Sequence, residues 1–373
     1  MNVFLMLKIY LRILVITWRV YGFGSAFLTW LLVEPMFRLI TALTLGLDHL
    51  LFRRFREVEV KRPIFIIGHP RSGTTFLHHL LSQGDTAAPF QAWHLLFPAL
   101  TARLVMRPLV KLLVKLGKTE MMPESTGHHM ALDQTEEEEM LFLHNYDTNF
   151  INIGMLSFDD RAYPELQYHD RQPKADRLRS LRFLDGCFRR HLLDTGRDQI
   201  IAQTHFSTFR LQTMLEFYPD AKFIFVMRNP HQVVPSFLSL LHNSMAFRWG
   251  VPASPKFLQR YNEHRFQGMV DLYRYFYDLD IRGELPRDRV LILPYDLLRN
   301  DLETAFARIV DFTGLAVSEA QRRAVAERGK RQQSYQRRHQ VKDLATFGLT
   351  RQRISEAFAF VFERYGLEDR WEE

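Results

Sequence analysis

The chain has 373 residues, 47% of them hydrophobic and 24% charged, so it can bury a sizeable core and is not a disordered protein. Its net charge of +7 favours anionic partners, but the basic residues are dispersed and form no nucleic-acid-binding motif, so we expect no nucleic-acid partner. The single cysteine, Cys187, excludes an internal disulfide, and the chain has no Asn-x-Ser/Thr acceptor. Both absences favour a reducing compartment over a secretory lumen.

The first 58 residues are predicted to form an apolar helical extension, and residues 59–373 the main domain. Lys8, Arg12 and Arg19 recur among apolar residues at helical spacing, which predicts a helix in a membrane interface with its basic face towards anionic head groups. No small-residue cleavage site follows the apolar run, so a cleaved signal peptide is not expected. We therefore predict a membrane-associated protein on the cytoplasmic face.

Two further features bear on this extension. Residues 21–33 are uncharged but too short to span a bilayer, and Glu34-Pro35 is predicted to interrupt them. A spanning helix is therefore less expected than an interfacial one. The alternative, that these helices cover the sheet or pack in a homo-oligomer, stays open.

A strand, a glycine-bounded loop and a helix follow. Residues 64–67 form a short apolar run typical of a strand buried on both faces, and an amphipathic helix begins at Thr74. Residues 68–73 form the loop between them. Backbone N–H groups and the positive end of the helix dipole would meet in this loop, and its side chains add further hydrogen-bond donors. The segment therefore predicts an anion site formed by Arg71, Ser72, Gly73, Thr74 and Thr75.

The loop is similar to the P-loop G-x-x-x-x-G-K-[ST], except that Thr74 occupies the lysine position. The sequence Pro-Arg-Ser-Gly-Thr-Thr-Phe-Leu from Pro70 resembles the 5′-phosphosulfate loop of sulfotransferases that use 3′-phosphoadenosine 5′-phosphosulfate (PAPS). The resemblance implies PAPS as the sulfuryl donor. A donor with less charge at the transferring group needs no metal, so none is expected.

Residues 92–118 form a second apolar and basic stretch, which Pro98 and Pro108 are predicted to break into short helices. It could line an acceptor pocket or extend the membrane-facing surface. A plain amphipathic core helix explains it equally well.

An acidic run occupies residues 136–139, and Thr135 is predicted to cap a helix that the glutamates open. Such a run is usually a solvated face. Bacterial sulfotransferases carry a similar block, which implies that Glu137 or Glu138 faces the acceptor as a base. His128 and its neighbour lack the spacing of a zinc site, so no metal site is predicted.

Residues 199–202 predict a buried strand that ends in Gln203-Thr204-His205. The trio is similar to the Lys-Thr-His of cytosolic sulfotransferases, whose histidine is the general base. His205 matches, whereas Gln203 replaces the lysine and brings no charge. The alternatives, that the base is His205 or a glutamate of the acidic run, stay open.

The next predicted strand, residues 222–227, ends in Arg228, and Ser236 follows eight positions later. An arginine at a strand end and a serine on the next helix can converge on one phosphate. In sulfotransferases an arginine and a serine at the same spacing bind the 3′-phosphate of the nucleotide. The resemblance therefore assigns Arg228 and Ser236 to the 3′-phosphate.

Later segments add weaker matches. Residues 290–298 resemble the family's Tyr-Glu-Asp-Leu segment, which implies that Tyr295 lies near the adenine. Basic residues at 328–331 and 337–339 read as a solvated loop, or by analogy as a clamp on the 3′-phosphate.

These features predict an α/β, P-loop-like three-layer fold with a mostly parallel sheet flanked by helices, plus the N-terminal extension. The predicted activity is sulfuryl transfer from PAPS to an acceptor hydroxyl, with an apolar or lipid-like acceptor. The alternatives are a P-loop small-molecule kinase, against which Thr74 argues, and a degenerate membrane-bound interaction protein, which Gln203 leaves open.

Overall fold

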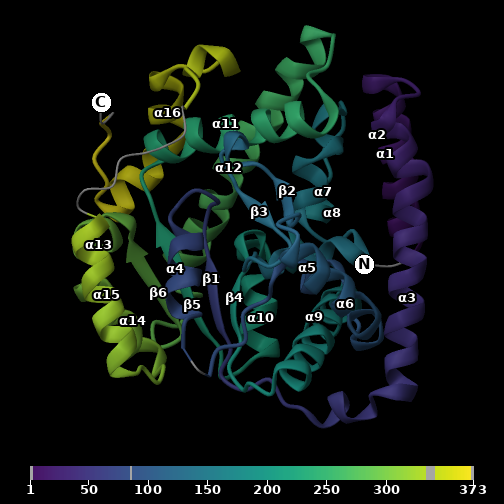
Figure 1. Ribbon diagram of the computed structural model, residues 1–373. Coiled ribbons are helices and arrows are strands. Elements are labelled where there is room, and N and C mark those ends of the chain that lie inside the picture. The colour runs from purple at the N-terminus through teal and green to yellow at the C-terminus, as the bar shows by residue number, and fades with distance from the viewer. Residues whose placement is uncertain (1–2, 85, 333–340, 371–373) are drawn as a thin grey trace.

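The computed structural model describes residues 3–84, 86–332 and 341–370 (Figure 1). Its centre is a four-stranded, fully parallel sheet in the order β4-β1-β5-β6. The strands are β1 (Ile64–Ile67), β4 (Ile201–Gln203), β5 (Lys222–Met227) and β6 (Val290–Pro294). A separate antiparallel pair is formed by β2 (Glu120–Met122) and β3 (Met130–Ala131), which lie between β1 and β4 in the sequence. The predicted mostly parallel sheet is confirmed.

The central strands are buried on both faces, as their continuous apolar sequences require. In β1, Phe65 and Ile67 enter one core while Ile64 and Ile66 enter the other. Pairing of Phe65 with Phe223 keeps the aromatic side chains of both strands on the same face.

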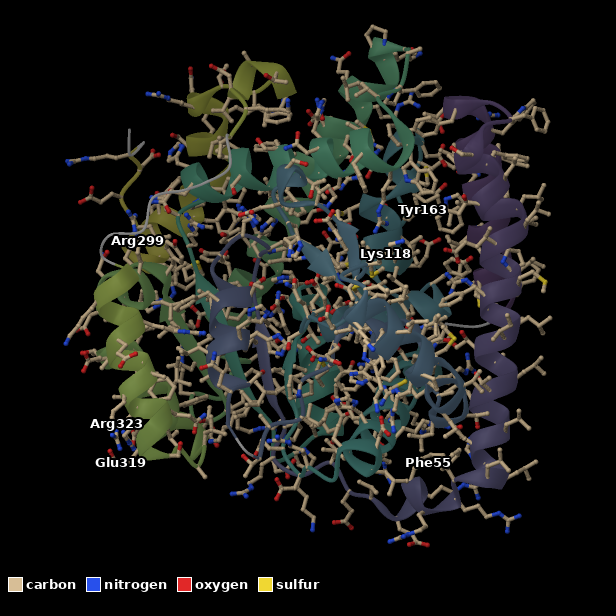
Figure 2. All side chains as sticks on the ribbon, viewed as in Figure 1. Phe55, Lys118, Tyr163, Arg299, Glu319 and Arg323 are labelled. Atoms are coloured by element: carbon tan, nitrogen blue, oxygen red, sulfur yellow. The ribbon has the colours of Figure 1, made fainter. Side chains whose placement is uncertain are left out.

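Helices cover both faces, which gives the three predicted layers. One core is closed by α9 (Lys174–Thr195), α10 (Leu211–Phe217), α11 (Pro230–Trp249), α12 (Pro255–Ile281) and α16 (Arg351–Tyr365). The other is closed by α4 (Thr74–Leu81), α13 (Tyr295–Asn300), α14 (Leu302–Thr313) and α15 (Glu319–Gln332). Figure 2 shows α15, which carries Glu319 and Arg323, on the side of the molecule away from the N-terminal helices.

Shorter elements complete the chain. Between β1 and β4 the chain also forms α5 (Ala92–Leu96), α6 (Leu100–Lys115), α7 (Asn149–Ile153) and α8 (Pro164–Gln167). Short 3₁₀ helices occupy Arg53–Glu57, Glu124–Thr126, Glu138–Asn145, Met155–Phe158, His169–Arg171, His205–Arg210 and Leu344–Phe347.

The predicted interruption at Glu34-Pro35 is wrong. Helix α2 (Ser25–Leu28) continues through a π-helical turn (Thr29–Val33) into α3 (Glu34–Leu51), which gives one 27-residue helical segment. The Glu34 N–H bonds to the carbonyl of Thr29, five residues back. We attribute the continuity to this wider turn, because a proline ring in a regular helix would clash with the carbonyl four residues earlier. By length and composition alone the segment could cross a membrane.

Helix α1 (Val3–Tyr21) packs against the body of the protein through Ile9, Ile13 and Ile16. The guanidinium of Arg12 donates from Nε to Oδ2 of the buried Asp159 at 2.6 Å. The prediction that Arg12 joins a basic face directed at head groups is therefore wrong, because the sequence did not reveal its distant acidic partner.

A buried carboxylate holds α3 in place. Asp48 accepts from the backbone N–H groups of Leu100 and Thr101, at 2.9 and 2.8 Å, and so caps α6. It also accepts from Arg190 Nε of α9 at 2.8 Å. The three helices α3, α6 and α9 therefore meet at one side chain. Whether residues 1–58 form a unit of their own stays a prediction.

The structure also corrects the reading of residues 92–118. Pro98 separates α5 from α6 as predicted, but Pro108 lies inside α6, so the predicted second break is wrong. We attribute the uninterrupted helix to its packing against α3. Apolar side chains on the outer sides of α1, α2–α3 and α6 are exposed, and Figure 2 shows side chains of α3 pointing away from the body of the protein. The larger ones, which we call the apolar face, are Phe4, Leu7, Leu11, Val15 and Trp18 of α1, Leu31, Leu32, Met36, Leu39, Ile40, Leu43 and Leu47 of α2–α3, and Leu104, Val105, Leu109 and Leu112 of α6.

Candidate active site

The loop between β1 and α4 depends on two glycines with positive φ angles. Gly68 has φ of +119°, and a Cβ there would come within 3.0 Å of the Val226 carbonyl oxygen. Gly73 has φ of +83°, and a Cβ there would lie 2.9 Å from Cε2 of Tyr295. Helix α4 begins after Gly73 without a side-chain cap. The first N–H groups of the helix have no partner within it, so this cradle fits an anionic group.

The two predicted anion sites lie side by side. Arg71 donates from Nε to the Ser236 hydroxyl at 3.1 Å, and Arg228 donates from Nη1 to the carbonyl oxygen of Arg71. The Arg228 guanidinium also lies over the ring of Tyr295, 3.9 Å from its centroid. The βα turns after β1 and β5 are thus joined through Arg71, as neighbouring parallel strands allow.

His205 lies next to this loop at the end of β4. Its Nδ1 lies 3.0 Å from the carbonyl oxygen of Gly68, so Nδ1 carries a proton and donates it. Its Nε2 lies 3.0 Å from Glu137 Oε2 and 2.8 Å from the amide nitrogen of Gln203. The same amide nitrogen donates to the Thr75 hydroxyl at 3.2 Å. Gln203 therefore connects the anion loop with the histidine.

The acidic run is not a solvated face, and Thr135 does not cap a helix. The turn begins at Glu138, with no side-chain cap, and the carboxylates face inward. The reason is that each meets a partner from elsewhere in the chain. Glu138 accepts from the backbone N–H of Gln203 at 2.7 Å, and Glu139 accepts from the Ser207 hydroxyl at 2.7 Å.

Glu137 is the carboxylate of this run that pairs with His205. Burial by itself would raise the pKa of Glu137, but the nearby His205, His128 and His78 outweigh it, and the pKa lies below its ordinary value. The carboxylate is therefore ionised at neutral pH. His128 in turn pairs with Glu136, Nε2 to Oε2 at 3.2 Å, and its pKa is raised, because this carboxylate outweighs the effect of burial.

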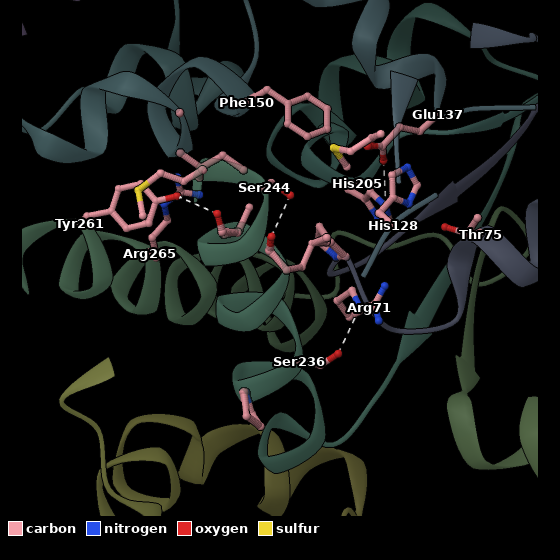
Figure 3. A pocket seen from close by; sticks show the side chains of 18 of the residues that line it. Arg71, Thr75, His128, Glu137, Phe150, His205, Ser236, Ser244, Tyr261 and Arg265 are labelled. Carbon is pink, nitrogen blue, oxygen red and sulfur yellow. Dashed lines mark hydrogen bonds and ion pairs between the residues drawn. The ribbon is translucent and has the colours of Figure 1, made fainter. Parts of the chain in front are cut away.

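One cavity of about 1340 Å³ joins these groups (Figure 3). At one end it is lined by the anion loop together with Arg228, Ser236 and Tyr295, and Glu137, His205 and Gln203 also face it. From there it extends into an apolar arm between the N-terminal helices, α7, α11 and α12. This arm is lined by Ile13, Trp30, Phe150, Ile151, Ile153, Met155, Phe158, Leu241 and Met245, among others.

Some predicted residues do not line the cavity. Ser72 is buried beneath the loop, and Glu138 lies behind Glu137 with its carboxylate 3.5 Å from His78 Nε2. Helix α6 faces outward and is also absent from the lining. The basic residues 328–331 belong to α15 rather than to a loop, and residues 328–330 are not among those that line the cavity. Residues 337–339 lie outside the described residues.

Other lining residues had no signal in the sequence. Trp30, Glu34 and Arg38 reach the cavity from the N-terminal segment, and Arg265 reaches it from α12. Each comes from an apolar or mixed helix with no motif around it. Among residues 3–84, 86–332 and 341–370, no group of three or more His, Cys, Asp or Glu side chains could hold a metal ion.

The sequence profile described as the sulfotransferase family matches residues 63–319, which is more than half of the chain. The chain belongs to the sulfotransferase family. The chain is 30% identical over 274 residues to the omega-hydroxy-beta-dihydromenaquinone-9 sulfotransferases Stf3 of Mycobacterium bovis and Mycobacterium tuberculosis. The match covers 70% of this chain and 66% of those relatives, just under two thirds of their length.

Solved structures agree on the fold. Sulfotransferase STF1 from Mycobacterium tuberculosis superposes with a TM-score of 0.70 at 19% identity, covering 94% of this chain and 91% of that one. Sulfotransferase STF9 from Mycobacterium avium gives a TM-score of 0.62 at 18% identity, covering 85% and 80%. The coverage of STF1 shows that the similarity of this sulfotransferase to it extends beyond residues 63–319 into the terminal segments.

Proposed function

We propose that the protein transfers a sulfuryl group from PAPS to a hydroxyl of an apolar, lipid-like acceptor. The observation that carries this proposal is one cavity, in which an anion loop, an ionised carboxylate next to a histidine, and an apolar arm meet. Family membership supports the reaction type.

The donor would be held at both of its charged ends. Arg71, Thr74, Thr75 and the N-terminus of α4 suit a 5′-phosphosulfate, and bound PAPS would supply the sulfuryl group there. Arg228 and Ser236 suit the 3′-phosphate, which ADP lacks. Tyr295 closes the space beside Gly73 and supports the guanidinium of Arg228. A metal is not required by this donor set.

The acceptor proton would pass to the Glu137–His205 pair. Nε2 of His205 already faces both Glu137 and Gln203, which leaves it no open lone pair. The Glu137 side chain is also more accessible, 18% exposed against 4% for His205. We therefore assign proton acceptance to the carboxylate and the positioning of that carboxylate to His205.

The acceptor arm and a relative support a lipid-like acceptor. The arm is lined mainly by aromatic and aliphatic side chains. The Stf3 relatives are named for an omega-hydroxylated dihydromenaquinone, which carries a hydroxyl on an apolar molecule. A lipid acceptor also explains why N-terminal helices would contribute Ile13 and Trp30 to a cavity that holds a nucleotide at its other end.

Membrane association would proceed through the apolar face. An exposed apolar surface of this extent marks an interaction site, and Arg53, Arg54 and Arg56 adjoin it as exposed cations suited to acidic lipids. The polar contacts of Asp48 and Arg38 hold α3 against the body, which favours a helix lying on the bilayer over one crossing it. We propose the cytoplasmic leaflet, consistent with the buried, unpaired Cys187.

Vesicle flotation tests this surface. A Leu39→Glu/Leu43→Glu variant should lose most binding to vesicles of phosphatidylcholine and phosphatidylglycerol, because two charges would enter the bilayer interface. Ile281→Glu, an exposed apolar residue at the end of α12, is the matched control and should bind normally. Equal flotation of both variants would contradict the proposal.

The donor is tested by calorimetry with the product nucleotide, 3′-phosphoadenosine 5′-phosphate (PAP). We expect PAP to bind without magnesium and more tightly than ADP, and Arg228→Ala to remove that preference. Turnover of radiolabelled PAPS with hexadecan-1-ol then tests transfer. Equal binding of ADP would mean that the 3′-phosphate site is wrong, and PAP binding without turnover on any alcohol would favour a degenerate, non-catalytic protein.

A further inference from the structure

Arg265 of α12 is a buried cation in the wall of the acceptor arm. Its side chain lines the cavity, and the residue is only 3% exposed. Figure 3 shows Arg265 and Tyr261 on the opposite side of the drawn cavity from Glu137 and His205. Nothing in the proposed transfer of the sulfuryl group uses this residue.

The guanidinium of Arg265 is poorly satisfied. Within the part of the chain that the structure describes, Nε and Nη1 have no hydrogen-bond partner, and no carboxylate lies within ion-pair distance. The guanidinium lies over the ring of Tyr261, whose centroid is 3.9 Å from Cζ. Burial lowers the pKa of Arg265, and the neighbouring Tyr261 and Tyr21 offset this effect only in part.

The other buried arginines of the described chain are different. Arg103, Arg190 and Arg210 are as deeply buried, and each has a carboxylate nearby: Asp194 at 3.3 Å, Asp48 at 2.8 Å and Asp147 at 4.0 Å, respectively. A buried charge normally needs such a partner, because removing a charged group from water is costly. A cation–π contact is weaker than the lost hydration and does not replace a carboxylate.

We propose that Arg265 binds an acidic oxygen group of the acceptor, a carboxylate or a phosphate, at the end remote from the reacting hydroxyl. The proposal rests on the proposed function, whose site supplies the hydroxyl end. The acceptor would then be an amphiphile with two polar ends: its hydroxyl at Glu137, its apolar body along the arm and its acid at Arg265. Tyr261 positions the guanidinium by stacking, and its hydroxyl donates to the Leu241 carbonyl oxygen at 3.2 Å.

The test measures binding of defined amphiphiles to the full chain by calorimetry, with saturating PAP to fill the donor anion sites. The probes are 12-hydroxydodecanoate and 16-hydroxyhexadecanoate, their methyl esters, and 12-hydroxydodecyl phosphate. We expect at least one acid to bind about 10-fold more tightly than its methyl ester. The reason is that a hydrogen bond to a charged carboxylate is stronger than one to a neutral ester by about that factor in affinity. The preferred chain length reports the spacing between Arg265 and the reacting end.

Variants assign the preference to Arg265. In Arg265→Gln the acid and ester should bind equally, whereas Lys256→Gln should keep the full difference. Lys256→Gln is the matched control, because this substitution removes one positive charge from an exposed position of the same helix, outside the cavity. Tighter binding of the phosphate than of the carboxylate would identify a phosphate-bearing acceptor.

Equal binding of every acid and its ester to the unaltered protein would overturn the proposal, and this comparison needs no variant. A preference for the acid that persists in Arg265→Gln would also overturn it. Failure of the proposed function has a different signature. In that case the acids would bind in an Arg265-dependent way, but no probe would accept a sulfuryl group from PAPS.

Discussion

Replacing Gly73 by alanine separates two contributions to the donor site. The backbone at Gly73 has φ of +83°, which costs an L-residue about 1 to 2 kcal/mol, so the variant should be less stable by that amount. The new Cβ would also lie 2.9 Å from Tyr295 Cε2, too close for the ring to stay in place. The ring supports the Arg228 guanidinium at 3.9 Å, a contact of about 1 to 2 kcal/mol. We therefore expect PAP to bind about 5- to 30-fold more weakly.

The assay is calorimetric PAP binding to four proteins: wild type, Gly73→Ala, Tyr295→Ala and the double variant, each with a thermal melt. If the ring transmits the effect, Gly73→Ala should have no further effect on affinity once Tyr295 is alanine. The loss of thermal stability should persist in both backgrounds. An equal loss of affinity with and without the ring would refute the reasoning and locate the effect in the loop backbone.

Three further predictions concern charged groups. Asp48→Ala should lower the free energy of unfolding by about 3 to 5 kcal/mol, because Arg190 would be left buried and unpaired. Urea titrations measure this loss, and the double variant Asp48→Ala/Arg190→Met should recover part of it. Glu137→Gln should lower kcat by about 10²- to 10⁴-fold and exceed the effect of His205→Asn; a smaller effect would make His205 the base. At Asp159, hydrogen bonds from Arg12 and Tyr163 outweigh the effect of burial and hold the pKa of the carboxyl well below its usual range. The contribution of this carboxylate to protein stability is therefore complete above about pH 4 and declines as the pH falls further. Thermal melts of Asp159→Asn between about pH 3 and 6 should lack this change.

The sheet and the donor loop could be predicted because their signals are local. A continuous apolar run such as residues 64–67 has few alternatives to a buried strand, and the loop after it has glycine where positive φ is required. The structure brings Arg228 and Ser236 to the loop after β1, since neighbouring parallel strands place their following turns at one edge, whereas their role at a 3′-phosphate stays a prediction.

The errors arose where distant partners decide the outcome. The acidic run is buried because Gln203 and Ser207 supply donors to it from beyond β4. Arg12 faces inward because Asp159 lies on a turn 147 residues later. The charge of Arg265 stands out only beside the other buried arginines and their acids. No local pattern contains this information.

The hydrogen bond from His205 to the Gly68 carbonyl has a consequence for how specificity can diversify. It fixes the imidazole tautomer from the backbone of the loop after β1, so the proposed proton-handling pair and the proposed nucleotide cradle form one unit built on β1, β4 and β5. The apolar arm is lined by side chains of the N-terminal segment, α7, α11 and α12, and α11 also carries Ser236 of the proposed donor site. In the proposed function, exchanging side chains of the N-terminal segment and α7 would therefore change the acceptor without altering the contact between His205 and Gly68.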